Sequence, residues 1–147
     1  MAHQAQASSG DWSLNLSSMK YGNNPVSTSA SKVVMSSVDP FIVLPQSEYD
    51  MYVQALQTSG LSSNQTSCLM NYEYCDASCT CSNLKSLVPS ISFELDTTTY
   101  VVDPSAFLVS GESDDNYNEC LLLVTNYTSS YRNSTNILLG LPFMWSY

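Results

Sequence analysis

The chain has 147 residues and a formal net charge of −9 at pH 7, with 13 Asp and Glu against 4 Lys and Arg. This length suits one domain with a hydrophobic core, and the 44% share of hydrophobic residues argues against disorder. The negative charge excludes nucleic acid and anionic membrane surfaces as partners, because both would repel the chain.

The first half of the chain predicts a leader, three strands and one helix. Residues 1–11 lack apolar periodicity and are interpreted as a flexible leader. Residues 12–16 alternate apolar and polar side chains, which is typical of a half-buried strand. Two apolar runs, 33–35 and 41–44, surround a short polar interruption and predict a buried loop held between two core strands. A short helix is predicted over residues 47–59, with Ser47 as its N-cap and a stripe of Tyr, Val and Leu side chains facing the core.

The second half predicts mostly strands. Residues 61–80 are polar, contain three cysteines and lack periodicity, so they are interpreted as a surface loop. Residues 91–95 and 100–102 form a predicted hairpin, followed by a turn or short helical start near Pro104. An acidic loop is expected over residues 110–119. Further apolar strands are predicted at 120–125 and 136–140. The expected fold class is therefore mainly β.

Residues 33–45 resemble the second active-site loop of pepsin-like aspartic peptidases. In that family, apolar residues lead into Asp-Thr/Ser-Gly-Thr-Ser, and a further apolar run ends at Gly/Leu-Pro. Laid over this motif without gaps, the sequence places Ser36 at the position of the catalytic aspartate and Ser37 at the Thr/Ser position. Val38 stands at the glycine position and Asp39 at the following threonine. The frame of the motif is present, but its catalytic carboxylate is absent.

The rest of the chain agrees with this resemblance in order. The matching segments are Trp12–Leu16, Met19–Gly22, Cys81–Pro89, Ile91–Leu95, Tyr100–Phe107, Leu138–Gly140 and Phe143. The resemblance implies that residues 12–147 are a partial C-terminal lobe, one lobe of the pepsin-like acid-protease β-barrel fold. It also implies that the full lobe would have additional strands before Trp12 and after Tyr147.

The activity that the resemblance implies is hydrolysis of peptide bonds by an acid-type aspartic endopeptidase. In that family, two aspartates from two lobes share one proton, and one of them activates a water molecule while the other polarises the scissile carbonyl. No cofactor and no metal are expected. The expected partners are a peptide or protein substrate and an N-terminal peptidase lobe in a longer parent chain.

The residues of the loop predict that this chain alone is catalytically inactive. Ser36 cannot replace an aspartate, because its hydroxyl does not ionise near the working pH. Val38 is bulkier and stiffer than the glycine of the family. Asp39 follows three residues later, and we expect its carboxylate to lie several ångströms from the catalytic position. The resemblance places Val34 and Asp39 in the substrate cleft, and it assigns Leu138, Leu139 and Gly140 to bracing the loop from behind.

Two alternatives to a peptidase lobe remain. The chain could be a pseudopeptidase, a non-catalytic secreted glycoprotein module that binds peptides or serves a structural role. It could also be an unrelated secreted β-domain, because segments in which a loop joins two strands are common.

Five cysteines and four Asn-x-Ser/Thr sequons favour a secretory, oxidising compartment, either extracellular or an acidic lumen such as a vacuole or lysosome. The sequons begin at Asn15, Asn64, Asn126 and Asn133. Residues 1–10 do not resemble a signal peptide, so we expect a piece of a longer secretory precursor. No apolar run is long enough to span a membrane.

The resemblance implies a disulfide between Cys81 and Cys120. The pairing of Cys68, Cys75 and Cys79 stays open, because one pair among them leaves one thiol free or intermolecular. Their spacing lacks the paired ligands of a zinc site. A calcium site is not expected in the acidic segment, which also lacks the ligand spacing of a known loop and is interpreted as a solvated surface. That segment contains Glu112, Asp114, Asp115 and Glu119.

Overall fold

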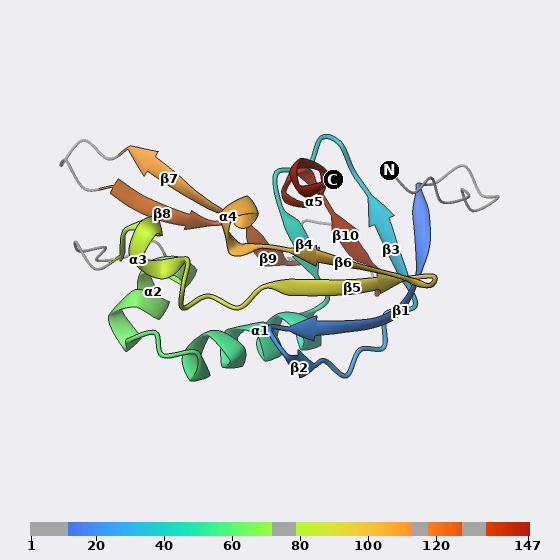
Figure 1. Cartoon of the computed structure of the whole chain (residues 1–147), viewed down its shortest axis with the longest axis horizontal. Helices are drawn as coiled ribbons and strands as arrows, with labels where there is room; N and C mark the ends of the chain where they lie inside the picture. Colours follow the sequence, from blue (N-terminus) through green and yellow to red (C-terminus); the bar gives the residue numbers. More distant parts are fainter. Residues whose placement is uncertain (1–11, 72–78, 113–117, 128–134) are drawn as a thin grey trace.

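A computed structural model describes residues 12–71, 79–112, 118–127 and 135–147 of the chain. Figure 1 shows that the molecule is elongated. The strands are β1 (Ser13–Tyr21), β2 (Asn24–Pro25), β3 (Lys32–Met35), β4 (Ile42–Leu44), β5 (Ile91–Leu95), β6 (Thr98–Val102), β7 (Leu108–Glu112), β8 (Asn118–Leu122), β9 (Val124–Asn126) and β10 (Ile137–Leu139). The helices are α1 (Gln46–Thr58), α2 (Ser63–Asn71), α3 (Cys81–Leu84), α4 (Pro104–Phe107) and α5 (Leu141–Ser146). The prediction of a mainly β fold is confirmed.

The strands form one 8-stranded sheet and one separate hairpin. The main sheet has the order β6-β5-β1-β3-β10-β4-β9, with β2 paired to β1, and the hairpin consists of β7 and β8. The long strand β1 pairs antiparallel with β3 through its first residues and with β5 through its last, with a register shift between Leu16 and Ser18. A bulge of this kind bends a strand. β1 can therefore pair with β3 at its start and with β5 at its end.

The hydrophobic core lies between the main sheet and the helices. Ile91, Phe93 and Leu95 of β5 are fully buried, and Tyr52 and Leu56 of α1 lie in the same core cluster. Burial of one such side chain stabilises the fold by about 1.5–3 kcal/mol. Figure 1 shows α1 running beside β1. The apolar stripe predicted for the helix of residues 47–59 therefore faces the core.

The helices differ from the prediction at several points. α1 begins one residue earlier than predicted, its N-cap is Pro45, and no side chain caps it, so the assignment of Ser47 as the N-cap is wrong. The interpretation of residues 61–80 as a loop without regular structure is also wrong, because α2 lies within them. The short helical start near Pro104 is α4, where the Asp103 carboxylate accepts a hydrogen bond from the backbone N–H of Ser105.

The predicted acidic loop is shorter than expected. Its two ends, residues 110–112 and 118–119, belong to the hairpin of β7 and β8. The antiparallel pairing of β7 with β8 continues from Ser110 and Cys120 to Glu112 and Asn118. Acidic residues can take part in it because the hydrogen bonds between strands join backbone groups. Residues 113–117, with Asp114 and Asp115, lie outside the described residues.

Candidate functional site

The candidate site is the loop of residues 36–41, which connects β3 to β4. These two strands are not neighbours, because β10 lies between them, parallel to β3 and antiparallel to β4. Figure 1 shows that the chain passes beside α5 on its way from β3 to β4. The loop is thus held by two buried strands, as the sequence predicts, and the residues that follow β10 lie behind it.

A tight turn around the Ser36 hydroxyl shapes the loop. The Ser36 Oγ donates a hydrogen bond to Asp39 Oδ2 at 2.7 Å. It also accepts weaker hydrogen bonds from the backbone N–H groups of Val38 and Asp39, at 3.4 and 3.3 Å. The side chains of Ser36 and Asp39 are partly buried. The hydroxyl is therefore occupied as donor and acceptor within its own turn.

Asp39 lies beside Ser36 in the same turn, where one oxygen of its carboxylate accepts a hydrogen bond from the Ser36 hydroxyl. That this carboxylate lies several ångströms from the catalytic position stays a prediction. The turn folds three residues back on themselves, so distance along the chain does not become distance in space. The loop therefore offers one carboxylate, beside the position that the family motif gives to aspartate.

The backbone of the loop is braced by the end of β10 and the start of α5. Ser36 N donates to Leu139 O at 2.9 Å, Gly140 N donates to Phe41 O at 3.1 Å, and Leu141 N donates to Asp39 O at 2.8 Å. A Cβ at Gly140 would lie 2.3 Å from the carbonyl oxygens of Asp39 and Phe41. Glycine is needed here for close approach of two backbone segments. These contacts hold the backbone of the loop against Leu139, Gly140 and Leu141, and the bracing role of residues 138–140 in the family sense stays a prediction.

The other residues expected at the site lie on or next to the loop. Val34 belongs to β3, where it pairs with Leu138 and is partly buried. Val33, its neighbour, is fully buried in the core, so Val34 faces the opposite side of the sheet. Ser37 is exposed, and Val38 is 83% exposed at the tip of the loop. The structure thus brings Ser36, Val38 and Asp39 together on one turn, with Val34 on the strand that precedes it.

A buried carboxylate near the loop was missed by the sequence analysis. Glu48 in the first turn of α1 is fully buried. Its Oε1 accepts hydrogen bonds from Thr28 Oγ1 at 2.6 Å and from Ser29 N at 3.3 Å, and its Oε2 accepts one from Ser47 Oγ. Acidic residues are common in the first turn of a helix, so no local pattern indicates that this one is buried. Glu48 links the segment that leads into β3 to the helix that follows β4.

The hydrogen bonds to Glu48 decide its ionisation. Burial alone would raise the pKa of Glu48, but the bonds from Ser47, Thr28 and the backbone lower it below its ordinary value. Tyr21 donates its hydroxyl proton to the backbone carbonyl oxygen of Glu48 at 2.6 Å, and the pKa of Tyr21 is raised by burial and by the negative charge of Glu48. Burial likewise raises the pKa of Tyr52. Glu48 is therefore charged and both tyrosines are neutral at neutral pH.

The cysteines divide into three groups. Cys81 at the start of α3 and Cys120 in β8 form the disulfide that the resemblance implies, with a sequence separation of 39. Cys68 in α2 is also disulfide-bonded. Cys79 is a buried free thiol, and Cys75 lies outside the described residues.

The sequon asparagines differ in their surroundings. Asn15 on β1 and Asn64 on α2 are exposed, and Asn15 Nδ2 donates to Asp96 Oδ1 at 3.3 Å. Asn126 on β9 is partly buried, and its Nδ2 donates to Gln46 Oε1 at 2.7 Å. Asn133 lies outside the described residues.

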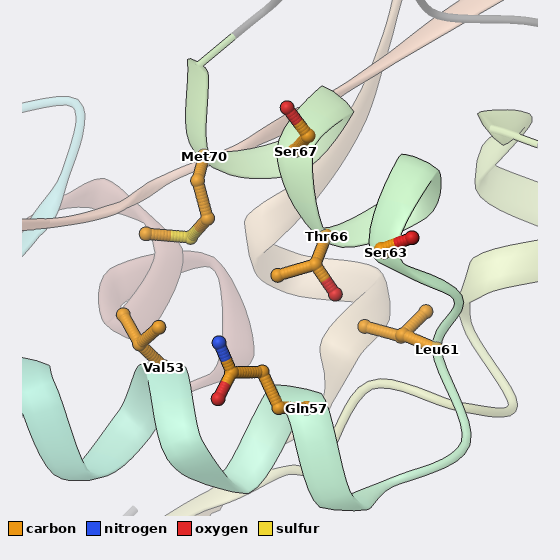
Figure 2. A pocket seen from close by; sticks show the side chains of 7 residues that line it. All are labelled: Val53, Gln57, Leu61, Ser63, Thr66, Ser67 and Met70. Atoms are coloured by element: carbon orange, nitrogen blue, oxygen red, sulfur yellow. The ribbon is translucent and has the colours of Figure 1, made fainter.

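A hollow lies between α1 and α2. Figure 2 shows side chains from both helices around this hollow of about 530 Å³. Its lining contains no titratable side chain and consists of Val53, Gln57, Leu61, Ser63, Thr66, Ser67 and Met70. General acid or base catalysis requires a side chain that can exchange a proton, so this hollow is not a candidate for such chemistry.

The described ranges contain neither a metal-binding cluster nor a membrane-spanning helix. No group of three or more His, Cys, Asp or Glu side chains in them could hold a metal ion. None of their helices has the length and hydropathy that a membrane span requires.

Comparison with known proteins gives one result for the whole chain. The family model described as eukaryotic aspartyl protease matches residues 2–147. A search of curated proteins finds no match.

Proposed function

Because the chain belongs to the eukaryotic aspartyl protease family, we propose that residues 12–147 form part of a C-terminal lobe of a pepsin-like peptidase and do not hydrolyse peptides alone. The mainly β fold is that of one pepsin-like lobe, as the family match and the sheet together indicate. The observation that carries the proposal of inactivity is the turn of Ser36 and Asp39, where a hydroxyl occupies the catalytic aspartate's position.

The chemistry of the family needs two carboxylates that share a proton. Ser36 is a poor replacement because a hydroxyl stays protonated near working pH. Its O–H also already donates a hydrogen bond to Asp39. Asp39 supplies one carboxylate to the loop. A second one would have to come from another lobe, so the proposed partner is an N-terminal peptidase lobe in a longer parent chain.

A second candidate function is non-catalytic binding of peptides in a pseudopeptidase. The observation that favours it is the exposed apolar side chain of Val38, presented on a loop whose backbone is braced at three points. An apolar, preorganised contact can bind an extended peptide without any proton transfer. Binding of such a peptide without cleavage, weakened by Val38→Ser, would favour this function over a peptidase lobe.

We place the protein in the secretory pathway, extracellular or in an acidic lumen. The disulfide between Cys81 and Cys120 supports this placement, since structural disulfides persist in oxidising compartments. The exposed sequon asparagines Asn15 and Asn64 could carry glycans without burial of the sugar. Glycan mass on the native protein tests this assignment, and a sugar-free protein from the cytosol would contradict it.

The proposal of inactivity is tested by restoring the family residues in the loop. The double variant Ser36→Asp and Val38→Gly should give no turnover of an internally quenched acid-peptidase substrate between about pH 3 and pH 6, because this chain alone lacks the second lobe's carboxylate. An active pepsin-like enzyme serves as the positive control, and wild type serves as the background. Turnover by the double variant that a statine inhibitor blocks would show that the second lobe is not required.

A further inference from the structure

Residues 27–30 form a strap between β2 and β3. Backbone hydrogen bonds fix the chain to β1 on either side of the strap. Val26 N donates to Met19 O at 3.0 Å before it, and Leu16 N donates to Ser31 O at 2.9 Å after it. Neither of these bonds reaches the middle of the strap, which is held by a contact with α1.

The carboxylate of Glu48 on α1 holds the middle of the strap. Its Oε1 accepts hydrogen bonds from Thr28 Oγ1 at 2.6 Å and from Ser29 N at 3.3 Å. Thr28 Oγ1 in turn accepts a hydrogen bond from Ala30 N at 3.0 Å, which stays within the strap. Among the described residues, the hydrogen bonds that join residues 27–30 to the rest of the chain are those to Glu48. One carboxylate oxygen therefore fixes the strap to α1.

The negative charge of Glu48 strengthens this contact. Hydrogen bonds to a charged oxygen are roughly twice as strong as bonds between neutral groups. An ionised carboxylate accepts hydrogen bonds at both oxygens, whereas a protonated one carries an O–H that donates. Both oxygens of Glu48 are in use, because Oε2 accepts a bond from Ser47 Oγ. The side chain is fully buried, so water does not replace a bond that protonation weakens or removes.

No other group of this cluster changes charge in the acid range. Burial acts to raise the pKa of Glu48, and all the groups that lower it are hydrogen-bond donors rather than cations. The strap carries no titratable side chain. Tyr21 of β1 donates to the backbone carbonyl oxygen of Glu48 at 2.6 Å, and its ring centroid lies 5.0 Å from that of Tyr52 on α1. Burial raises the pKa of both tyrosines, so they stay neutral in acid. The next carboxylate on α1, Asp50, is exposed.

We propose that Glu48 is an acid-operated latch, which holds residues 27–30 against α1 while it is ionised and releases them when it is protonated, with the main sheet still paired. The released strap leads directly into β3, the strand that enters the candidate loop. The ladder between β1 and β5 involves only backbone groups and does not depend on the carboxylate. The latch includes no residue of the loop 36–41, so it does not rest on the proposed function of that loop.

The strap should open as the pH falls. The folded-state pKa of Glu48 lies below its ordinary value of 4.5, so the latch is closed above that value and opens as the pH falls through the folded-state pKa. Hydrogen exchange of the whole chain, followed by mass spectrometry, measures this opening against an unfolded reference at each pH. Between about pH 6 and pH 3, residues 27–30 should lose about tenfold or more in protection, while residues 91–95 of β5 keep theirs.

Glu48→Gln removes the group that titrates. In this variant the strap should be as poorly protected at about pH 6 as the wild-type strap is at about pH 3, and lowering the pH should not change it further. Thr28→Val removes one donor to the carboxylate and should move the opening to higher pH, because that hydrogen bond favours the ionised form. Thr28→Ser is the matched control, since it keeps the hydroxyl and should open where wild type does.

Three results would overturn the latch. The first is a strap that keeps its protection at about pH 3 in wild type. The second is loss of protection in the strap and in β5 together, because the chain would then unfold as a whole. The third is opening of Thr28→Val and Thr28→Ser at the same pH. The two Thr28 variants decide the question even if Glu48→Gln does not fold.

Discussion

Ser36 and Asp39 show how a three-residue turn changes the chemistry of a loop. The sequence places Ser36 at the catalytic aspartate's position, but a gapless comparison treats residues as if they were evenly spaced in space. The turn closes because the N–H groups of Val38 and Asp39 point at the Ser36 hydroxyl, which brings the Asp39 carboxylate beside it. The motif could therefore predict which carboxylate is missing, but not where the neighbouring one lies.

The burial of Glu48 depends on contacts that are distant in the sequence. Its position in the first turn of a helix is ordinary. Its hydrogen-bond partners Thr28 and Ser29 lie 20 and 19 residues earlier, in a different segment of the chain. No local pattern could have predicted this long-range contact. The hydrogen bonds of Glu48 to Thr28 and Ser29 hold the segment before β3 against α1. They thus connect the segments that precede and follow the two strands of the candidate loop.

Glu48→Gln should destabilise the protein at neutral pH by about 1–3 kcal/mol, because an amide cannot accept all the hydrogen bonds that the buried carboxylate accepts. The folded-state pKa of Glu48 lies below its ordinary value of 4.5. The extra stability of wild type is thus fully present above the unfolded-state pKa and is lost as the pH falls through the folded-state pKa. Urea unfolding of both proteins across the acid range measures the difference.

The control for this prediction is Asp50→Asn on the same helix. Asp50 is exposed and accepts a hydrogen bond from Gln46, so its substitution should change stability by less than about 0.5 kcal/mol. A stability difference between Glu48→Gln and wild type that stays constant from neutral to acid pH would contradict the account of Glu48.

At the scale of elements, strands were easier to predict than helices. The alternation in residues 91–95 and the apolar runs around the loop follow from side chains that face one core, and the structure has strands there. α2 escaped prediction because its Ser, Asn, Gln and Thr residues hide the apolar periodicity, although Cys68 and Leu69 are buried. The hairpin of β7 and β8 was partly missed because its acidic ends were interpreted as loop.

The disulfide connects the helix α3 to the separate hairpin of β7 and β8. Cys81 begins α3, and Cys120 lies in β8 of the separate hairpin. The double variant Cys81→Ser and Cys120→Ser should lose roughly 4 kcal/mol of unfolding free energy, because the cross-link no longer restricts the unfolded chain. Chemical denaturation followed by circular dichroism measures this loss.

Cys79→Ala is the matched control for the disulfide, since it removes a buried thiol that forms no disulfide. Its cost should be near 1 kcal/mol, which is typical of a single buried substitution. If the double variant costs no more than this control, the disulfide does not contribute what the length of its closed loop implies.

At the scale of the whole molecule, the strand order places the candidate site. Because β10 lies between β3 and β4, the loop that joins them must cross the end of β10, and Gly140 allows the two backbones to meet there. This arrangement could be inferred only through the family resemblance, since pairing between distant strands leaves no local pattern. The fold therefore presents a braced loop with one carboxylate, and we expect peptidase chemistry at this loop only together with a second lobe.

The most direct measurement of that claim is hydrolysis by the wild-type chain itself. Purified protein is incubated with a diverse peptide mixture between about pH 3 and pH 6, the range in which carboxylate pairs are active, and new peptide ends are identified by mass spectrometry. We expect no new ends above those in a protein-free control. Cleavage that a statine inhibitor stops and that Asp39→Asn abolishes would contradict this expectation, because the single carboxylate of this loop would then suffice for catalysis.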